Sequence, residues 1–127
     1  MITHGFKKMI AEANAVIDTV SVADAYAKIN DGDVVFVDVR EKHERDGNGH
    51  IAGSIHVPRG FLELIADPEG PMHNEIMVSG KQLILYCGTG GRAALATKTL
   101  LDMGLTNLSN LAGGFAGWVE NDRPIEK

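Results

Sequence analysis

The chain of 127 residues contains one cysteine, and this scarcity limits its chemistry. Without a second thiol no disulfide can form within the chain, so a scaffold held together by disulfides is excluded. Zinc clusters built on cysteines are excluded for the same reason, and the five histidines show no ligand spacing such as H-x3-H. The sequence therefore predicts neither a metal site nor another bound cofactor.

Basic charge and long apolar runs are also lacking. Twelve Lys and Arg residues face 17 Asp and Glu residues, which gives a net charge of −5. A nucleic-acid surface needs clustered positive charge, so nucleic acid is not an expected partner. The basic first residues are followed by Glu12 and Asp18, so neither a signal-peptide core nor a membrane span is predicted. We expect a cytoplasmic protein in which any anion site is a local arrangement.

What remains is an ordinary globular composition, with 44% hydrophobic and 23% charged residues. We divide the chain into residues 1–18 and a domain of residues 19–127. The apolar residues of the first part recur at helical spacing and predict an amphipathic helix packed on the domain. They are Phe6, Met9, Ile10, Ala13, Val16 and Ile17.

In the second part, short apolar runs alternate with helical patterns. The strand candidates are residues 34–37, 55–57, 83–86 and 108–111, with a further short strand near Val20. The helix candidates are residues 60–66, residues 92–103 and a segment that begins at the capping residue Ser21 and runs through Ile29. Residues 67–80 have little periodicity and predict a long connection. This order predicts an α/β fold with a mostly parallel sheet covered by helices on both faces.

The residues Cys87 to Arg92 lie between the run Leu83–Tyr86 and a predicted helix. Ligands of open α/β sheets bind beyond the carboxyl ends of the strands. Three glycines let this segment curl, so that backbone N–H groups point inward, and the following helix adds a partial positive charge. Such surroundings favour the thiolate, so Cys87 is predicted to be a largely ionised nucleophile. Arg92 adds a permanent charge for an anionic substrate.

Two other interpretations of these residues stay open at this point. A single cysteine at the end of a buried strand is by default a small apolar side chain of the core. A Gly-Thr-Gly-Gly turn before a helix is also typical of phosphate sites, where Cys87 would be a bystander.

Several segments, in this order, resemble the rhodanese family from about Val20 to Pro124. They are Val37–Glu41 with Glu44, Gly49–Pro58, Cys87–Arg92 and Leu111–Trp118. The resemblance implies a rhodanese-like fold with a five-stranded, mostly parallel sheet. It also implies a sulfurtransferase, in which Cys87 takes a sulfur from thiosulfate or a related small anionic donor and holds it as a persulfide. The acceptor would be cyanide or a thiol, including a protein thiol.

In this resemblance the substrate-binding residues are Gly88, Thr89, Gly90, Gly91 and Arg92. Members of the family that handle sulfur have six residues in this loop, whereas related tyrosine-phosphatase-like domains have one more. Cys87 to Arg92 are six residues, which favours sulfur transfer over phosphate or arsenate chemistry. A binding module without turnover and a persulfide sensor are the alternatives. The presence of both Cys87 and Arg92 favours an enzyme, and the absence of a resolving cysteine disfavours a sensor.

Other polar residues are expected beside the site in supporting roles. Asp38 and Arg40 end the second predicted strand and are expected to form an ion pair that shapes the edge of the loop. Glu44 lies four residues after Arg40 and is expected to form a salt bridge, either along a helix face or one that orders the loop. The resemblance places His50 in a structural turn, and a proton shuttle at His50 or His56 is not required by an ionised thiolate. Gly113 and Gly114 predict a tight bend, and Trp118 a core position.

Overall fold

Five parallel strands form the centre of the computed structural model, which describes all 127 residues. Their order across the sheet is β1-β6-β5-β2-β4, and every neighbouring pair is parallel. The strands are β1 (Asp18–Val20), β2 (Val34–Asp38), β4 (Ile55–His56), β5 (Gln82–Tyr86) and β6 (Leu108–Leu111). The predicted five-stranded α/β architecture is thereby confirmed. β5, the central strand, ends directly before Cys87.

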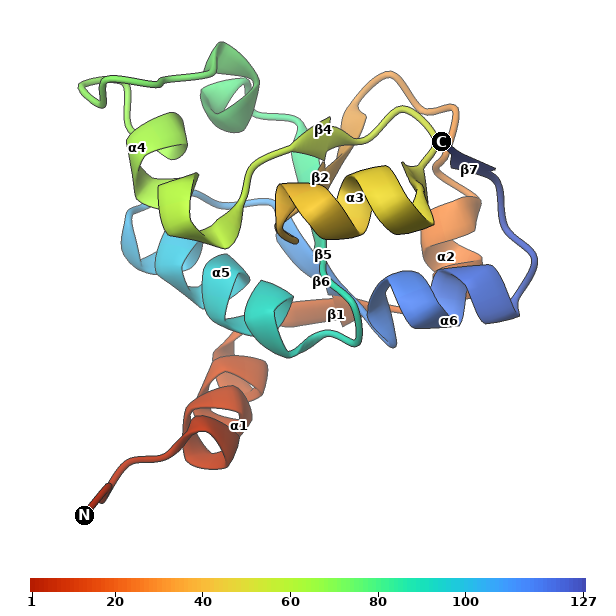
Figure 1. Cartoon of the computed structure of the whole chain (residues 1–127). Helices are drawn as coiled ribbons and strands as arrows, with labels where there is room; N and C mark the ends of the chain where they lie inside the picture. Colours follow the sequence, from red (N-terminus) through yellow and green to blue (C-terminus); the bar gives the residue numbers. More distant parts are fainter.

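Helices cover both faces of this sheet because the strands are apolar on both sides (Figure 1). Along β5, Leu83 and Leu85 pack with α4 (Leu62–Ala66) and α5 (Gly91–Asp102). The alternate residues Ile84 and Tyr86 face α2 (Val22–Tyr26) and α6 (Gly114–Glu120). Both faces of the central strand are therefore buried, as in other parallel sheets covered by helices.

Several local elements differ from the expectations. Ser21 Oγ accepts the Asp24 N–H at 3.1 Å as predicted, but α2 ends at Tyr26 and is followed by turns rather than helix through Ile29. The connection 67–80 contains a 3-10 helix, Glu75–Val78. A second, antiparallel sheet pairs β3 (His50–Ile51) with β7 (Ile125–Glu126), which brings the end of the chain beside residues that follow α3 (Lys42–Asn48).

The predicted N-terminal helix forms α1 (Phe6–Val16), which lies against α5. Only part of its apolar stripe is covered. Ala13 is fully buried, whereas Phe6 is 58% exposed and Met9 is 42% exposed. In Figure 1, α1 extends beyond the body on the side where the loop between β5 and α5 lies. No helix is both long and apolar enough to cross a membrane.

Candidate active site

The cysteine loop, Cys87–Arg92, curls around the sulfur atom at the end of β5. The Sγ atom of Cys87 accepts a hydrogen bond from the Gly90 N–H at 3.0 Å and a longer one from the Ala93 N–H at 3.4 Å. The second donor belongs to the first turn of α5, where backbone N–H groups have no partner within the helix. Gly90 has φ +116°, a conformation that favours glycine. The sulfur therefore sits among donors at the positive end of a helix of 12 residues.

The same loop is held from outside by the start of α6. The Phe115 N–H donates to the Cys87 carbonyl at 2.8 Å, and the Ala116 N–H donates to the Gly88 carbonyl at 3.0 Å. This approach requires glycine at 114, because a Cβ there would lie 2.7 Å from the Cys87 carbonyl oxygen. Gly114 and its neighbour Gly113 both have positive φ, so the predicted tight bend is present. The carbonyls of Cys87 and Gly88 consequently face α6.

Arg92 lies at the edge of the cysteine loop and is engaged by Glu44 of α3. Two hydrogen bonds join the guanidinium to the carboxylate, at 2.7 and 2.9 Å. A Cβ on Gly88 would lie 3.3 Å from Nη2 of Arg92, so the guanidinium is beside the loop backbone. Hydrogen bonding from Arg92 lowers the pKa of Glu44 to about 2, and that from Glu44 raises the pKa of Arg92. The salt bridge expected for Glu44 is thus formed with Arg92 of the cysteine loop and not with Arg40, four residues before it.

The physical reason is that Arg40 points into the core. Its guanidinium donates to both oxygens of Asp38, at 3.0 and 2.9 Å, and to the Gly49 carbonyl at 2.7 Å. It also lies 4.2 Å above the centroid of the Phe115 ring. Glu44, on the half-buried face of α3, instead bonds Arg92 of α5 and completes a capping box with Glu41.

The carboxylate of Asp38 is the centre of a buried polar network. It accepts hydrogen bonds from Arg40, from Arg45 at 3.1 Å and from the Tyr86 hydroxyl at 3.1 Å. Burial alone would raise the pKa of Asp38, but the hydrogen bonds from Arg40 outweigh it and the pKa lies below its usual range. Burial raises the pKa of Tyr86 to about 12. The predicted Asp38–Arg40 pair is thus present, and it anchors the segment that carries Glu44.

The histidines weighed from the sequence make contacts away from Cys87. His50 lies in β3, 3.7 Å from a carboxylate oxygen of Glu126, and burial lowers its pKa. His56 bonds the Arg40 carbonyl at 2.8 Å, and His73 bonds the Ile65 carbonyl at 3.1 Å. All three therefore have structural partners within the chain.

Two contacts to the cysteine loop were not foreseen. The side-chain amide of Asn110, on β6, donates to the Gly90 carbonyl at 3.4 Å. The ring of Phe6, on α1, lies against Gly91. A polar residue within the apolar run 108–111 was an available signal for Asn110. For Phe6 the sequence offered none, because the contact joins residues far apart in the chain. Of the other residues singled out in the sequence, Thr89 is exposed. Trp118 is fully buried, as predicted.

The protein is thus an α/β domain with a parallel sheet, and its cysteine lies in a loop at the end of the central strand, surrounded by backbone N–H donors. Comparisons with known proteins identify the family of such domains to which it belongs. The family described as "Rhodanese-like domain" matches residues 21–121, and the chain belongs to this family. It is 32% identical to thiosulfate sulfurtransferase 16, chloroplastic, of Arabidopsis thaliana, covering 92% of this chain and 99% of that protein. It is 35% identical to thiosulfate:glutathione sulfurtransferase of Saccharomyces cerevisiae, covering 72% and 69%.

Among solved structures, a protein of unknown function from Rhodopseudomonas palustris, described as a possible tyrosine phosphatase, superimposes with a TM-score of 0.95. It is 42% identical and the match covers 99% of this chain and 97% of that one. The similarity thus extends over the N-terminal helix as well as the domain. The comparisons establish a rhodanese-like protein with sulfurtransferase relatives.

Proposed function

We propose that this protein is a sulfurtransferase that carries a sulfane sulfur as a persulfide on Cys87. The observation that carries the proposal is the pair of backbone N–H groups, from Gly90 and Ala93, that donate to Sγ of Cys87. Donors fixed in this way stabilise a thiolate and, after sulfur transfer, a persulfide anion. The relatives that are thiosulfate sulfurtransferases support the same reaction class.

The reaction balances in two steps without another oxidant or reductant. The Cys87 thiolate attacks the outer sulfur of thiosulfate, the sulfur–sulfur bond of thiosulfate breaks, and its electron pair leaves with sulfite. The enzyme then holds the anion Cys87–S–S⁻. Cyanide or a thiolate attacks the outer sulfur, the persulfide bond breaks, and the electron pair returns to Cys87. The product is thiocyanate or an organic persulfide, and total charge is conserved in both steps.

Arg92 is the proposed donor-binding side chain. Its guanidinium is 41% exposed and lies beside the loop backbone at Gly88, so an incoming oxyanion can reach it. The side chain already shares two hydrogen bonds with Glu44. An anionic sulfur donor must therefore displace Glu44 or bind Arg92 beside it. The cysteine loop supplies the neutral backbone donors and Arg92 the charge.

Intact-mass measurement on the purified protein tests the proposal directly. After brief incubation with thiosulfate, the wild type is expected to gain the mass of one sulfur atom and to lose it when cyanide is added. Cys87→Ala is expected to gain nothing while remaining folded, because the change is small. Sulfur gain by Cys87→Ala would show that another group is the nucleophile. No gain by the folded, reduced wild type would favour a binding module or a donor other than thiosulfate.

Phosphate-ester hydrolysis is the second candidate, because the Rhodopseudomonas palustris relative is described as a possible tyrosine phosphatase. The six-residue cysteine loop disfavours it, since the corresponding loop of related tyrosine-phosphatase-like domains is one residue longer. We expect no hydrolysis of p-nitrophenyl phosphate by a preparation that forms the persulfide. Turnover of this ester that disappears in Cys87→Ala would reverse the preference.

A further inference from the structure

The aromatic ring of Phe6 lies against the cysteine loop at Gly91. A Cβ placed on Gly91 would meet Cζ of Phe6 at 3.0 Å and Cδ1 of Ile10 at 3.7 Å. Gly91 is adjacent to Gly90, whose N–H donates to the sulfur of Cys87. The loop has no side chain of its own at this position, and a ring from another element occupies the space.

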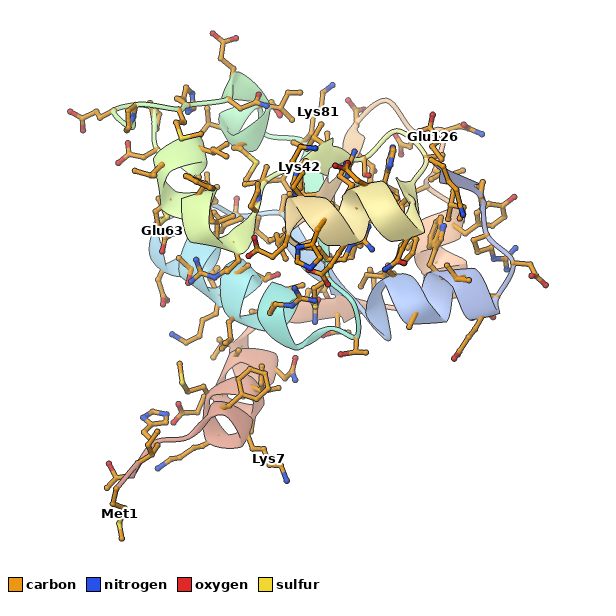
Figure 2. All side chains as sticks on the ribbon, viewed as in Figure 1. Met1, Lys7, Lys42, Glu63, Lys81 and Glu126 are labelled. Carbon is orange, nitrogen blue, oxygen red and sulfur yellow. The ribbon has the colours of Figure 1, made fainter.

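The ring is held in place yet open to solvent. Fully buried Ala13 and half-buried Ile10 fix α1 on the domain, while Phe6 remains 58% exposed. Figure 2 shows the neighbouring Lys7 pointing away from the body of the molecule. The side chains of α1 that lie nearest Gly91, Phe6 and Ile10, are both apolar.

The two sides of the cysteine loop thus differ in chemistry. On the side of α3 lies the guanidinium of Arg92, paired with Glu44. On the side of α1 lies the Phe6 ring, which offers a face for apolar or aromatic groups. An inorganic acceptor such as cyanide has nothing to place against that ring, whereas an organic thiol with an apolar group has.

We propose that α1 forms the acceptor-side wall of the active site and that Phe6 selects organic thiols that carry an apolar group. This inference rests on the proposed sulfurtransferase function and names its acceptor class. The acceptor thiolate attacks the outer sulfur of the Cys87 persulfide, the persulfide bond breaks, and Cys87 recovers the electron pair. The product is the organic persulfide, while the apolar group of the acceptor packs on the Phe6 ring.

The test compares acceptors on protein that has first been loaded from thiosulfate. Sulfur transfer to phenylmethanethiol, 2-mercaptoethanol and cyanide is measured for the wild type, Phe6→Ala and Met9→Ala. Met9 is the matched control, an exposed apolar side chain of the same helix. We expect Phe6→Ala to lower kcat/KM for phenylmethanethiol about tenfold and to change the values for the other two acceptors less than about twofold. Each acceptor is compared between variants, so its own reactivity cancels.

The opposing outcomes are distinct. Equal losses with all three acceptors would mean that Phe6 only orders the loop, and no loss with phenylmethanethiol would mean that the ring is not used; either overturns the inference. A similar loss in Met9→Ala would also overturn it. A wild type that gains no sulfur overturns the proposed function and this inference with it. That failure is detected by mass before any acceptor is added.

A second measurement tests the contact itself without any activity. Gly91→Ala is expected to lower the Tm of the wild type by about 3 °C, because its Cβ meets the Phe6 ring. In a Phe6→Ala background the same change is expected to raise the Tm, since alanine suits the first turn of a helix better than glycine. The same shift in both backgrounds would show that Phe6 does not lie on Gly91.

Discussion

Two arginine–carboxylate pairs, Arg40 with Asp38 and Arg92 with Glu44, lie near the segment between β2 and α3. They differ in how far they are buried. The Arg40 and Asp38 side chains are 2% and 0% exposed, and Arg40 is additionally covered by the Phe115 ring. The Arg92 and Glu44 side chains are 41% and 23% exposed. The same chemistry thus occurs once as a fixed part of the interior and once at the entrance to the cysteine loop, where partners can be exchanged.

The comparison shows that the same type of ion pair can serve stability when it is buried and ligand binding when it is exposed. A buried pair loses its hydration on folding, so either partner left alone is an uncompensated charge. A pair at the surface retains much of its hydration and contributes little to stability, but its cation stays available to a ligand. We therefore expect the buried pair to determine the stability of the fold and the exposed pair to determine how well the sulfur donor binds.

The largest effect is expected when the buried pair is broken. Asp38→Asn leaves two guanidinium groups, Arg40 and Arg45, without their shared carboxylate. We expect the free energy of unfolding to fall by about 3–5 kcal/mol, measured by urea denaturation. Glu63→Gln, in the exposed pair with Arg59, is the control and is expected to cost less than about 1 kcal/mol. Similar small losses in both variants would remove the proposed contrast.

The next effect concerns the donor. Arg92→Ala is expected to raise the KM for thiosulfate about tenfold, because a charge-assisted contact is lost. The free energy of unfolding is expected to change by less than about 1 kcal/mol. Arg92→Lys keeps the charge but not the planar pair of donors, so an intermediate KM is expected. An unchanged KM in Arg92→Ala would show that the backbone N–H groups bind the donor alone.

The smallest effect is expected from Glu44→Gln, which frees Arg92 from its charged partner. The KM for thiosulfate is expected to fall about twofold to threefold, since the donor no longer competes with a carboxylate. A rise in the KM would mean that Glu44 orients Arg92 for the donor rather than competing with it.

The contribution of Glu44 to the free energy of unfolding is expected to depend on pH. Because the folded-state pKa of Glu44, about 2, lies below the usual 4.5, ionised Glu44 stabilises the folded protein above pH 4.5. This contribution is lost as the pH falls from 4.5 towards 2. Exposure of the pair limits it to about 1 kcal/mol. Urea denaturation at pH 7 and pH 3 should show the difference between wild type and Glu44→Gln shrinking at the lower pH; a constant difference would contradict the assignment.

The central strands and the cysteine loop could be predicted because their signals are local. Leu83–Tyr86 is apolar on both faces, and the glycines that follow mark the turn into α5. α3 was not predicted as a helix because none of its residues is buried, so it has no apolar period. The two strands β3 and β7 contain two residues each, and their pairing depends on the return of the chain end. The partner of Glu44 could not be identified because spacing along the chain cannot reveal that this side chain reaches Arg92 of α5.

The hydrogen bonds from α6 to the cysteine loop have a consequence for the order of assembly. The carbonyls of Cys87 and Gly88 are held by the N–H groups of Phe115 and Ala116, which are synthesised later than the loop. Until that segment has emerged and packed, the carbonyls of Cys87 and Gly88 lack the partners that orient their peptide planes. A nascent chain that ends before Gly113 therefore has Cys87 without these two contacts, and we expect the reactivity proposed for Cys87 to develop fully only once the C-terminal helix has packed.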